Sequence, residues 1–193
     1  MRHTGDAVPG RLIHVVLDPH RTDRAIDQAL SLRPSGRIRC APQDVESVAV
    51  RYSLNVFIME YRDDLRGDLS ACLREIRRHS ADIIRLAPVI AFVREPTRDN
   101  IRYLLGQGVD DIVLAAAGPR EFWSRLKTLL GKPMEFFETD DYFGPDRRRG
   151  LPPQDLSEAR IQRAPRDRFF VVRNEDGCHR VVEPTVGSAG QAA

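Results

Sequence analysis

Four positions at the ends of short apolar runs are the candidate site residues of this chain. Asp18 and Glu60 supply carboxylates at two of these run ends. Carboxylate oxygens are the ligands that Mg²⁺ prefers, and a Mg²⁺ site needs one or two of them with further oxygen ligands. Val93 and Ala115 end two other runs, and neither side chain can form a hydrogen bond. The chain therefore has an acid at the end of two apolar runs and a side chain without hydrogen-bonding groups at the end of two others.

Short apolar runs alternate with amphipathic stretches between residues 12 and 130. The runs are short and rich in β-branched residues, which is typical of strands buried on both faces. The stretches between them carry apolar residues at helical spacing. This alternation predicts an α/β fold with a doubly wound parallel sheet, and right-handed crossovers allow few topologies. Strands are expected at 12–17, 37–41, 54–60, 88–93 and 112–115, and helices at 23–32, from 42, at 67–78, from 97 and from 119.

The bulk composition excludes several classes of protein. The 193 residues are enough for one sizeable core and an appendage. A net charge of +2 is too small to indicate a nucleic-acid partner. Three widely spaced cysteines fit reduced thiols, and no Cys/His spacing suggests a zinc site. We find no signal peptide and no apolar stretch of the roughly 20 residues that a membrane span needs, so we expect a cytoplasmic protein without membrane insertion.

Residues 10–131 resemble the receiver domain of bacterial response regulators. The resemblance is carried by the segments 54–60, 67–69, 88–93 and 108–119. That family has the flavodoxin-like strand order 2-1-3-4-5. It places an acidic pair after its first strand, a phospho-accepting Asp after its third, Thr or Ser after its fourth and Lys after its fifth. The resemblance implies this fold and a role in two-component, phosphorelay signal transduction.

The sequence departs from the pattern of that family at four places and keeps one acid of the pair. Leu17 stands at the first acid of the pair and Asp18 at the second, while Glu60 stands at the phospho-acceptor. Val93 replaces the hydroxyl and Ala115 the lysine. We therefore expect a pseudo-receiver that is no enzyme, binds no cofactor and holds no Mg²⁺. Glu60 then either mimics a phosphorylated acid or has no role.

The missing chemistry leaves three functional hypotheses. The first is a phosphorylation-independent protein-interaction module. The second is a working receiver whose acceptor is Glu60, although the extra methylene moves the carboxylate out of line. The third is a small-ligand sensor that uses the emptied crevice. No Ser/His/Asp triad, Cys/His pair or Gly-rich phosphate loop supports an enzyme.

In the resembled family, the fourth helix, fifth strand and fifth helix meet partners or a second copy of the chain. We expect a signalling protein or a self-dimer to bind at the same face here. The candidate contacts are Arg98, Arg102, Tyr103, Trp123 and Lys127.

Residues 132–193 are predicted to form a C-terminal extension of short irregular elements. It would hold a short helix at 155–163, a β-hairpin at 168–182 and a disordered end at 185–193. It shows no pair of helices for DNA binding. One segment resembles C-terminal extensions of receiver-like proteins from alphaproteobacteria. Its aromatic and basic residues could dock on a partner or a phosphate, or its aromatics could pack onto the domain itself: Tyr142, Phe143, Arg147, Arg148 and Arg149.

Overall fold

The computed structural model describes residues 11–20, 24–31, 37–146, 167–174 and 176–181. Five strands form an all-parallel sheet in the order β2-β1-β3-β4-β5, which confirms the predicted fold class and its flavodoxin-like order. Every residue of β3 and β4 is buried, as their continuous apolar sequence predicts. The strands are β1 (Arg11–Val15), β2 (Arg37–Cys40), β3 (Asn55–Tyr61), β4 (Val89–Val93) and β5 (Asp111–Leu114).

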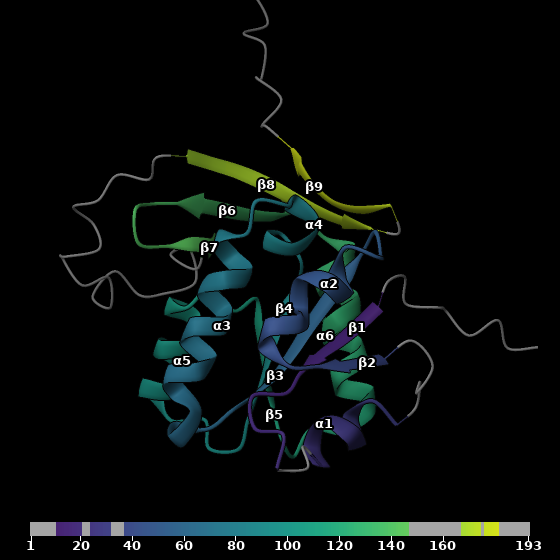
Figure 1. Ribbon diagram of the computed structural model, residues 1–193, viewed down its shortest axis with the longest axis vertical. Helices are drawn as coiled ribbons and strands as arrows, with labels where there is room; N and C mark the ends of the chain where they lie inside the picture. The colour runs from purple at the N-terminus through teal and green to yellow at the C-terminus, as the bar shows by residue number, and fades with distance from the viewer. Residues whose placement is uncertain (1–10, 21–23, 32–36, 147–166, 175, 182–193) are drawn as a thin grey trace, which may run out of the picture.

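Helices cover both faces of this sheet (Figure 1). Residues of α1 and α6 pack on one face in one buried apolar cluster. Residues of α2, α3, α4 and α5 pack on the other face in a second cluster. The helices are α1 (Arg24–Ala29), α2 (Val45–Ala49), α3 (Arg66–Arg78), α4 (Asp82–Arg85), α5 (Arg98–Gly106) and α6 (Pro119–Gly131), with short 3-10 helices η1 (Pro42–Asp44) and η2 (Asp63–Leu65). The short helix α4 was not predicted.

The C-terminal part of the chain forms a separate antiparallel sheet in the order β7-β6-β8-β9. The strands β8 (Asp167–Asn174) and β9 (Gly177–Val181) are the predicted hairpin. The strands β6 (Met134–Glu138) and β7 (Phe143–Pro145) were not predicted, and they turn a hairpin into a four-stranded sheet. The predicted helix at 155–163 and the chain end at 185–193 lie outside the described residues.

The second sheet packs against the amino ends of the parallel strands (Figure 1). Its inner face contributes Phe136, Phe143 and Phe169 to the apolar cluster on the α2–α5 side of the first sheet. Gly108, just before β5, has a φ of 85°, and a Cβ atom there would lie 2.7 Å from the carbonyl oxygen of Phe143. Glycine is needed at this position both for the left-handed backbone and for the close approach of β7. The two sheets thus share one core, although α6 ends at the predicted boundary, Gly131.

Among the described residues, no helix combines the length and the apolar character that crossing a bilayer requires.

Candidate functional site

The four positions singled out in the sequence all lie at the carboxyl edge of the parallel sheet. Asp18 follows β1, and Glu60 is the second-last residue of β3. Val93 ends β4, and Ala115 directly follows β5, where its backbone N–H donates to the Val93 carbonyl at 2.8 Å. The carboxyl ends of parallel strands meet at one edge, so the strand order brings these segments to the same edge of the sheet.

The strand register divides the four positions between the two faces of the sheet. Glu60 pairs with Phe92, whereas Tyr61 pairs with Val93. Side chains alternate along a strand, so Glu60 points to the α1–α6 face with Phe92. Val93 packs with Tyr61 in the cluster on the other face. Val93 therefore does not face the Glu60 carboxylate.

The Glu60 carboxylate is buried and held by an arginine. Only 6% of Glu60 is exposed, and the Nε atom of Arg94 donates to its Oε1 at 2.7 Å. Arg94 follows β4 directly, and its side chain is 60% exposed. A guanidinium thus covers the carboxylate from the solvent side.

A second arginine binds the other carboxylate of the edge. The Nη1 atom of Arg62 lies 3.3 Å from Oδ2 of Asp18, and Arg62 also forms an ion pair with Asp64. The hydrogen bond to Asp64 raises the pKa of Arg62, burial lowers it, and the hydrogen bond to Asp18 adds to the rise. The other oxygen of Asp18 accepts the backbone N–H of His20 at 3.0 Å. Both candidate acids are therefore engaged by groups of the same chain.

The loops that follow β3 and β4 are tied to each other. The hydroxyl of Tyr61 lies 2.7 Å from Oδ1 of Asp63 and 3.0 Å from Oδ1 of Asn100. The Nδ2 atom of Asn100 donates to the Glu95 carbonyl at 3.2 Å. Burial, and then the hydrogen bond to Asp63, raise the pKa of Tyr61 to about 12, so the phenol stays protonated. These contacts fix the start of α5 relative to the end of β3.

The donor set at this edge does not fit a Mg²⁺ ion. Leu17 stands where the first acid of the expected pair would be, so that carboxylate is missing. The carboxylates of Asp18 and Glu60 each pair with an arginine. Within the part of the chain that the structure describes, no three His, Cys, Asp or Glu side chains are grouped as metal ligands would be. The two arginines thus occupy one oxygen of each acid at this edge.

The residues expected on the interaction face lie in two different environments. Arg98, Arg102 and Lys127 are exposed. Tyr103 instead points toward α3, because its hydroxyl donates to the Arg66 carbonyl at 2.7 Å. The guanidinium of Arg66 lies 3.8 Å from the centre of the Tyr103 ring.

Trp123 also packs inward, in the apolar cluster of the α1–α6 face. It is half-buried, and its ring stands edge-on to Phe122 at 5.1 Å. Sequence reasoning missed Leu114, which is 43% exposed on the edge strand β5. The sequence signal that could have identified Leu114 is its position as an aliphatic residue at the end of the last strand of the sheet.

The aromatic residues of the tail segment pack on their own chain. Tyr142 stacks on Phe137 with ring centres 4.7 Å apart and donates its hydroxyl to the Pro145 carbonyl at 2.9 Å. Phe143 is buried against Phe136 and Phe169. The adjoining basic residues Arg147, Arg148 and Arg149 lie outside the described residues.

A buried ionic cluster at the amino edge was not predicted. Arg77 and Arg173 donate to the two oxygens of Asp110, Oδ2 at 2.5 Å and Oδ1 at 2.7 Å. Arg77 also donates to the carbonyl of Gly108, and Arg173 to that of Leu86 at 2.8 Å. Burial alone would raise the pKa of Asp110, but the guanidinium groups of Arg173 and Arg77 hold it below its usual range. The cluster joins the second sheet to the first.

Comparisons with known proteins add little to this geometry. No protein-family model matches the chain, and no curated protein matches it. Solved structures that match include the phosphorylated cyanobacterial phytochrome response regulator RcpA, at 15% identity and a TM-score of 0.38. That match covers 62% of this chain and 91% of the other. At this level of similarity, the assignment of the fold depends on the strand order itself.

Proposed function

We propose that this chain is a receiver-like signalling module that works without phosphoryl transfer and acts by binding another protein. The proposal is supported by a flavodoxin-like sheet whose carboxyl edge carries the acids Asp18 and Glu60. The single observation that carries it is the pairing of both acids with arginines of the same chain.

The chemistry of phosphoryl transfer explains why this pairing matters. A carboxylate nucleophile must lie in line with the phosphorus, while a metal ion and a cation neutralise the charge that develops. Here Glu60 is buried behind Arg94, and Asp18 is bound to Arg62. Val93 and Ala115 offer no group that could hold a phosphoryl oxygen. Arg62 and Arg94 supply positive charge at this edge in place of the metal ion and the lysine. Both guanidinium groups are bound to the two acids and not to a phosphoryl group.

The ion pairs Arg62–Asp18 and Arg94–Glu60 favour a single conformation of the carboxyl edge that does not change with phosphorylation. Arg94 ties the loop after β4 to β3, and Arg62 ties the loop after β3 to the end of β1. The contact between Tyr61 and Asn100 adds a third link. A permanent set of charge pairs would hold these loops in one arrangement, as a bound phosphoryl group does in switching proteins.

The face formed by α5, β5 and α6 is the proposed partner surface. It combines the exposed apolar side chain of Leu114 with the cationic side chains of Arg98, Arg102 and Lys127. An apolar centre with a charged rim is the usual composition of a protein interface. We propose a signalling protein with an acidic rim, or a second copy of this chain, as the occupant.

Two measurements test this function. Incubation with acetyl phosphate and Mg²⁺ followed by intact-mass spectrometry tests the absence of phosphoryl transfer, and an adduct would favour a working receiver. Capture of partners from the native host with the full chain, compared with a Leu114→Arg variant, tests the interaction surface. Partners that bind both forms equally would contradict the assignment of the α5–β5–α6 face.

A further inference from the structure

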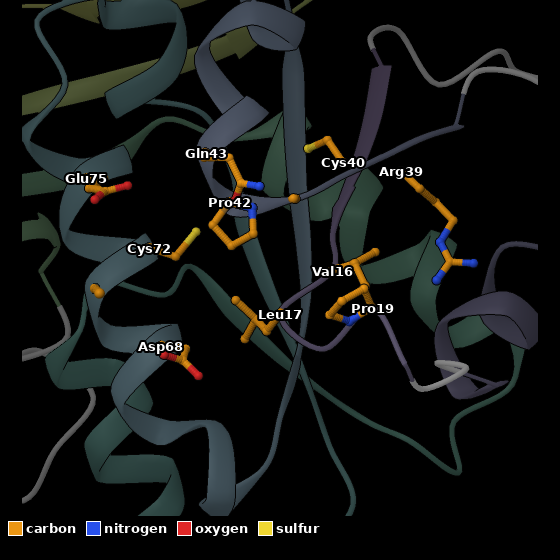
Figure 2. A pocket seen from close by; sticks show the side chains of 12 residues that line it. Val16, Leu17, Pro19, Arg39, Cys40, Pro42, Gln43, Asp68, Cys72 and Glu75 are labelled. Atoms are coloured by element: carbon orange, nitrogen blue, oxygen red, sulfur yellow. The ribbon is translucent and has the colours of Figure 1, made fainter.

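A cleft of about 720 Å³ opens between α3 and the segments that follow β1 and β2 (Figure 2). Its volume lies within the roughly 300–1,000 Å³ that is usual for sites that bind small molecules. Leu17 and Pro19 line it, whereas Asp18, the residue between them, binds Arg62 instead. The cleft therefore lies outside the ion pairs of the carboxyl edge.

One wall of the cleft is a flank of α3. It consists of four residues at helical spacing, Asp68, Ala71, Cys72 and Glu75. Asp68 and Glu75 are seven residues apart, so they lie on the same face of the helix, about 10.5 Å apart along its axis. Ala71 and Cys72 lie between them. The wall therefore carries a carboxylate at each end and a stretch without charge in the middle.

Both carboxylates lack a hydrogen-bond or ion-pair partner within the described part of the chain. Arg78, one turn after Glu75, instead donates to the Asp140 carbonyl at 3.2 Å. The helix dipole stabilises an acid in the first turn, such as Asp68, and destabilises an acid in the last turn, such as Glu75. Helix stability therefore explains the acid at position 68 and does not explain the one at position 75.

The floor of the cleft is apolar and chemically quiet. Leu17, Cys40 and Cys72 contribute to it. Burial, and then the charge of Asp44, raise the pKa of Cys40 to about 11. Burial, and then the charge of Glu75, raise the pKa of Cys72 to about 12. Both thiols stay protonated at neutral pH, so they act as small apolar side chains and not as nucleophiles or metal ligands.

Arg39 also lines the cleft, but it does not face the α3 wall. Side chains alternate along a strand, so Arg39 points to the opposite face of β2 from the buried Cys40. Figure 2 shows Arg39 beyond Val16 and Pro19, on the side away from α3. This arginine therefore does not neutralise the two acids. The charge that complements them is a pair of positive groups about 10 Å apart.

We propose that this cleft binds a linear aliphatic diamine, with one ammonium group against Asp68 and the other against Glu75. Its methylene chain lies along Ala71 and Cys72 and covers Leu17. Primary alkylamines are protonated at neutral pH, as lysine is, so both ends carry the required charge. A chain of eight methylene groups separates its nitrogens by about 11 Å, because bonds of about 1.5 Å advance about 1.25 Å each along the chain. This inference goes beyond the proposed function, because a ligand in this cleft does not involve the α5–β5–α6 face.

The test is a titration of the isotope-labelled full chain with amines, in which NMR follows the chemical shifts of the backbone amides. The probes are octamethylenediamine, putrescine, which is too short to reach both acids, and octylamine, which has a single charge. We expect octamethylenediamine to shift the amides of the α3 residues that line the cleft. Its dissociation constant should be at least threefold lower than those of the other two amines. The factor is modest because exposed ion pairs contribute little each.

Four variants test whether binding depends on these residues. Asp68→Asn and Glu75→Gln each remove one carboxylate with little change of shape, so each should remove the preference for octamethylenediamine over octylamine. Ala71→Phe fills the space between the acids and should abolish the shifts, while circular dichroism shows that the fold is retained. Asp99→Asn, which changes an exposed acid in the first turn of α5, is the matched control and should leave binding unchanged.

The proposal is overturned if octamethylenediamine at millimolar concentration does not shift the amides of α3, or shifts acidic segments over the whole surface equally. It is also overturned if putrescine or octylamine binds as tightly as octamethylenediamine. Survival of the preference in Asp68→Asn or Glu75→Gln protein, or of binding in a folded Ala71→Phe protein, would contradict it as well.

Discussion

The Nε atom of Arg94 lies 2.7 Å from Oε1 of Glu60, a carboxylate that is 94% buried at the end of a parallel strand. The two residues come from neighbouring strands, because Glu60 belongs to β3 and Arg94 directly follows β4. An exposed guanidinium thus pairs with a buried acid.

Removal of Arg94 should destabilise the protein more than a surface ion pair would. Arg94→Ala removes an ion pair from the buried Glu60 carboxylate, so we expect a loss of about 1–3 kcal/mol of unfolding free energy. The double variant Glu60→Gln/Arg94→Ala should recover part of this loss, because no buried charge remains. Urea unfolding of the two single variants and the double variant measures the coupling. A coupling near zero would show that the pair has no energetic role.

The buried cluster around Asp110 should be the most sensitive polar site in the fold. Asp110→Asn leaves the guanidinium groups of Arg77 and Arg173 buried without their anion, so we expect a loss of about 3–5 kcal/mol. Asp111→Asn is the matched control, because Asp111 is only partly buried and its ion pair with Arg125 is half-exposed. Equal losses in chemical unfolding of the two variants would contradict the account of the cluster.

The contribution of Asp110 should depend on pH. Its pKa is lowered in the folded state, so its stabilising effect is fully present above the unfolded value of about 3.9 and is lost as the pH falls through the folded value. The difference in stability between wild type and Asp110→Asn should therefore shrink below about pH 4. Unfolding curves at neutral pH and at a series of acidic values measure this difference. A gap that stays constant over the whole range would contradict the assignment.

The second sheet should contribute to the stability of the first through its inner face. Phe136→Ala removes a fully buried ring from the shared core, and we expect a loss of about 3–5 kcal/mol. Phe137→Ala removes the neighbouring ring, which is half-buried and stacks on Tyr142, so a loss of about 0.5–1.5 kcal/mol is expected. Thermal unfolding of the two variants should show this order, and the reverse order would place the shared core elsewhere.

The partner surface can be tested without disturbing the core. Leu114→Arg and Lys127→Glu change exposed side chains on β5 and α6, so both should lower partner binding or self-association by at least tenfold while the melting temperature changes little. Arg74→Glu on α3 is the control. Sedimentation velocity tests self-association, and binding assays with a captured partner test the alternative. If only Arg74→Glu lost binding, the partner surface would lie on α3 and not on the α5–β5–α6 face.

The α/β class was predictable from the sequence pattern and the strand order from the resemblance to receivers, whereas the contacts at the carboxyl edge were not. Continuous apolar runs identify β3 and β4, and helical spacing identifies α3. In contrast, Asp110 and Asp111 are adjacent acids with the same local signals, yet one is buried between two arginines and the other is partly exposed. That difference arises because Arg173, far along the chain, returns to the amino edge.

The arginines at the carboxyl edge show the same limit. The sequence could identify which receiver-type groups are missing at Val93 and Ala115. It could not predict that Arg62 and Arg94 pair with the remaining acids, because an arginine in a loop has many partners within reach. The extension is a further case: alternation in β8 and the turn before Gly177 predict a hairpin, but β6 and β7 depend on packing against the first sheet.

The most direct test of the central claim is intact-mass spectrometry after incubation with acetyl phosphate and Mg²⁺, in the wild type and in Arg94→Ala. We expect no added phosphoryl mass in either protein, because removal of Arg94 breaks one contact of Glu60 but restores neither a metal site nor a cation that could hold the phosphoryl group. A stable adduct that maps to Glu60 or Asp18 in the wild-type chain would contradict the account.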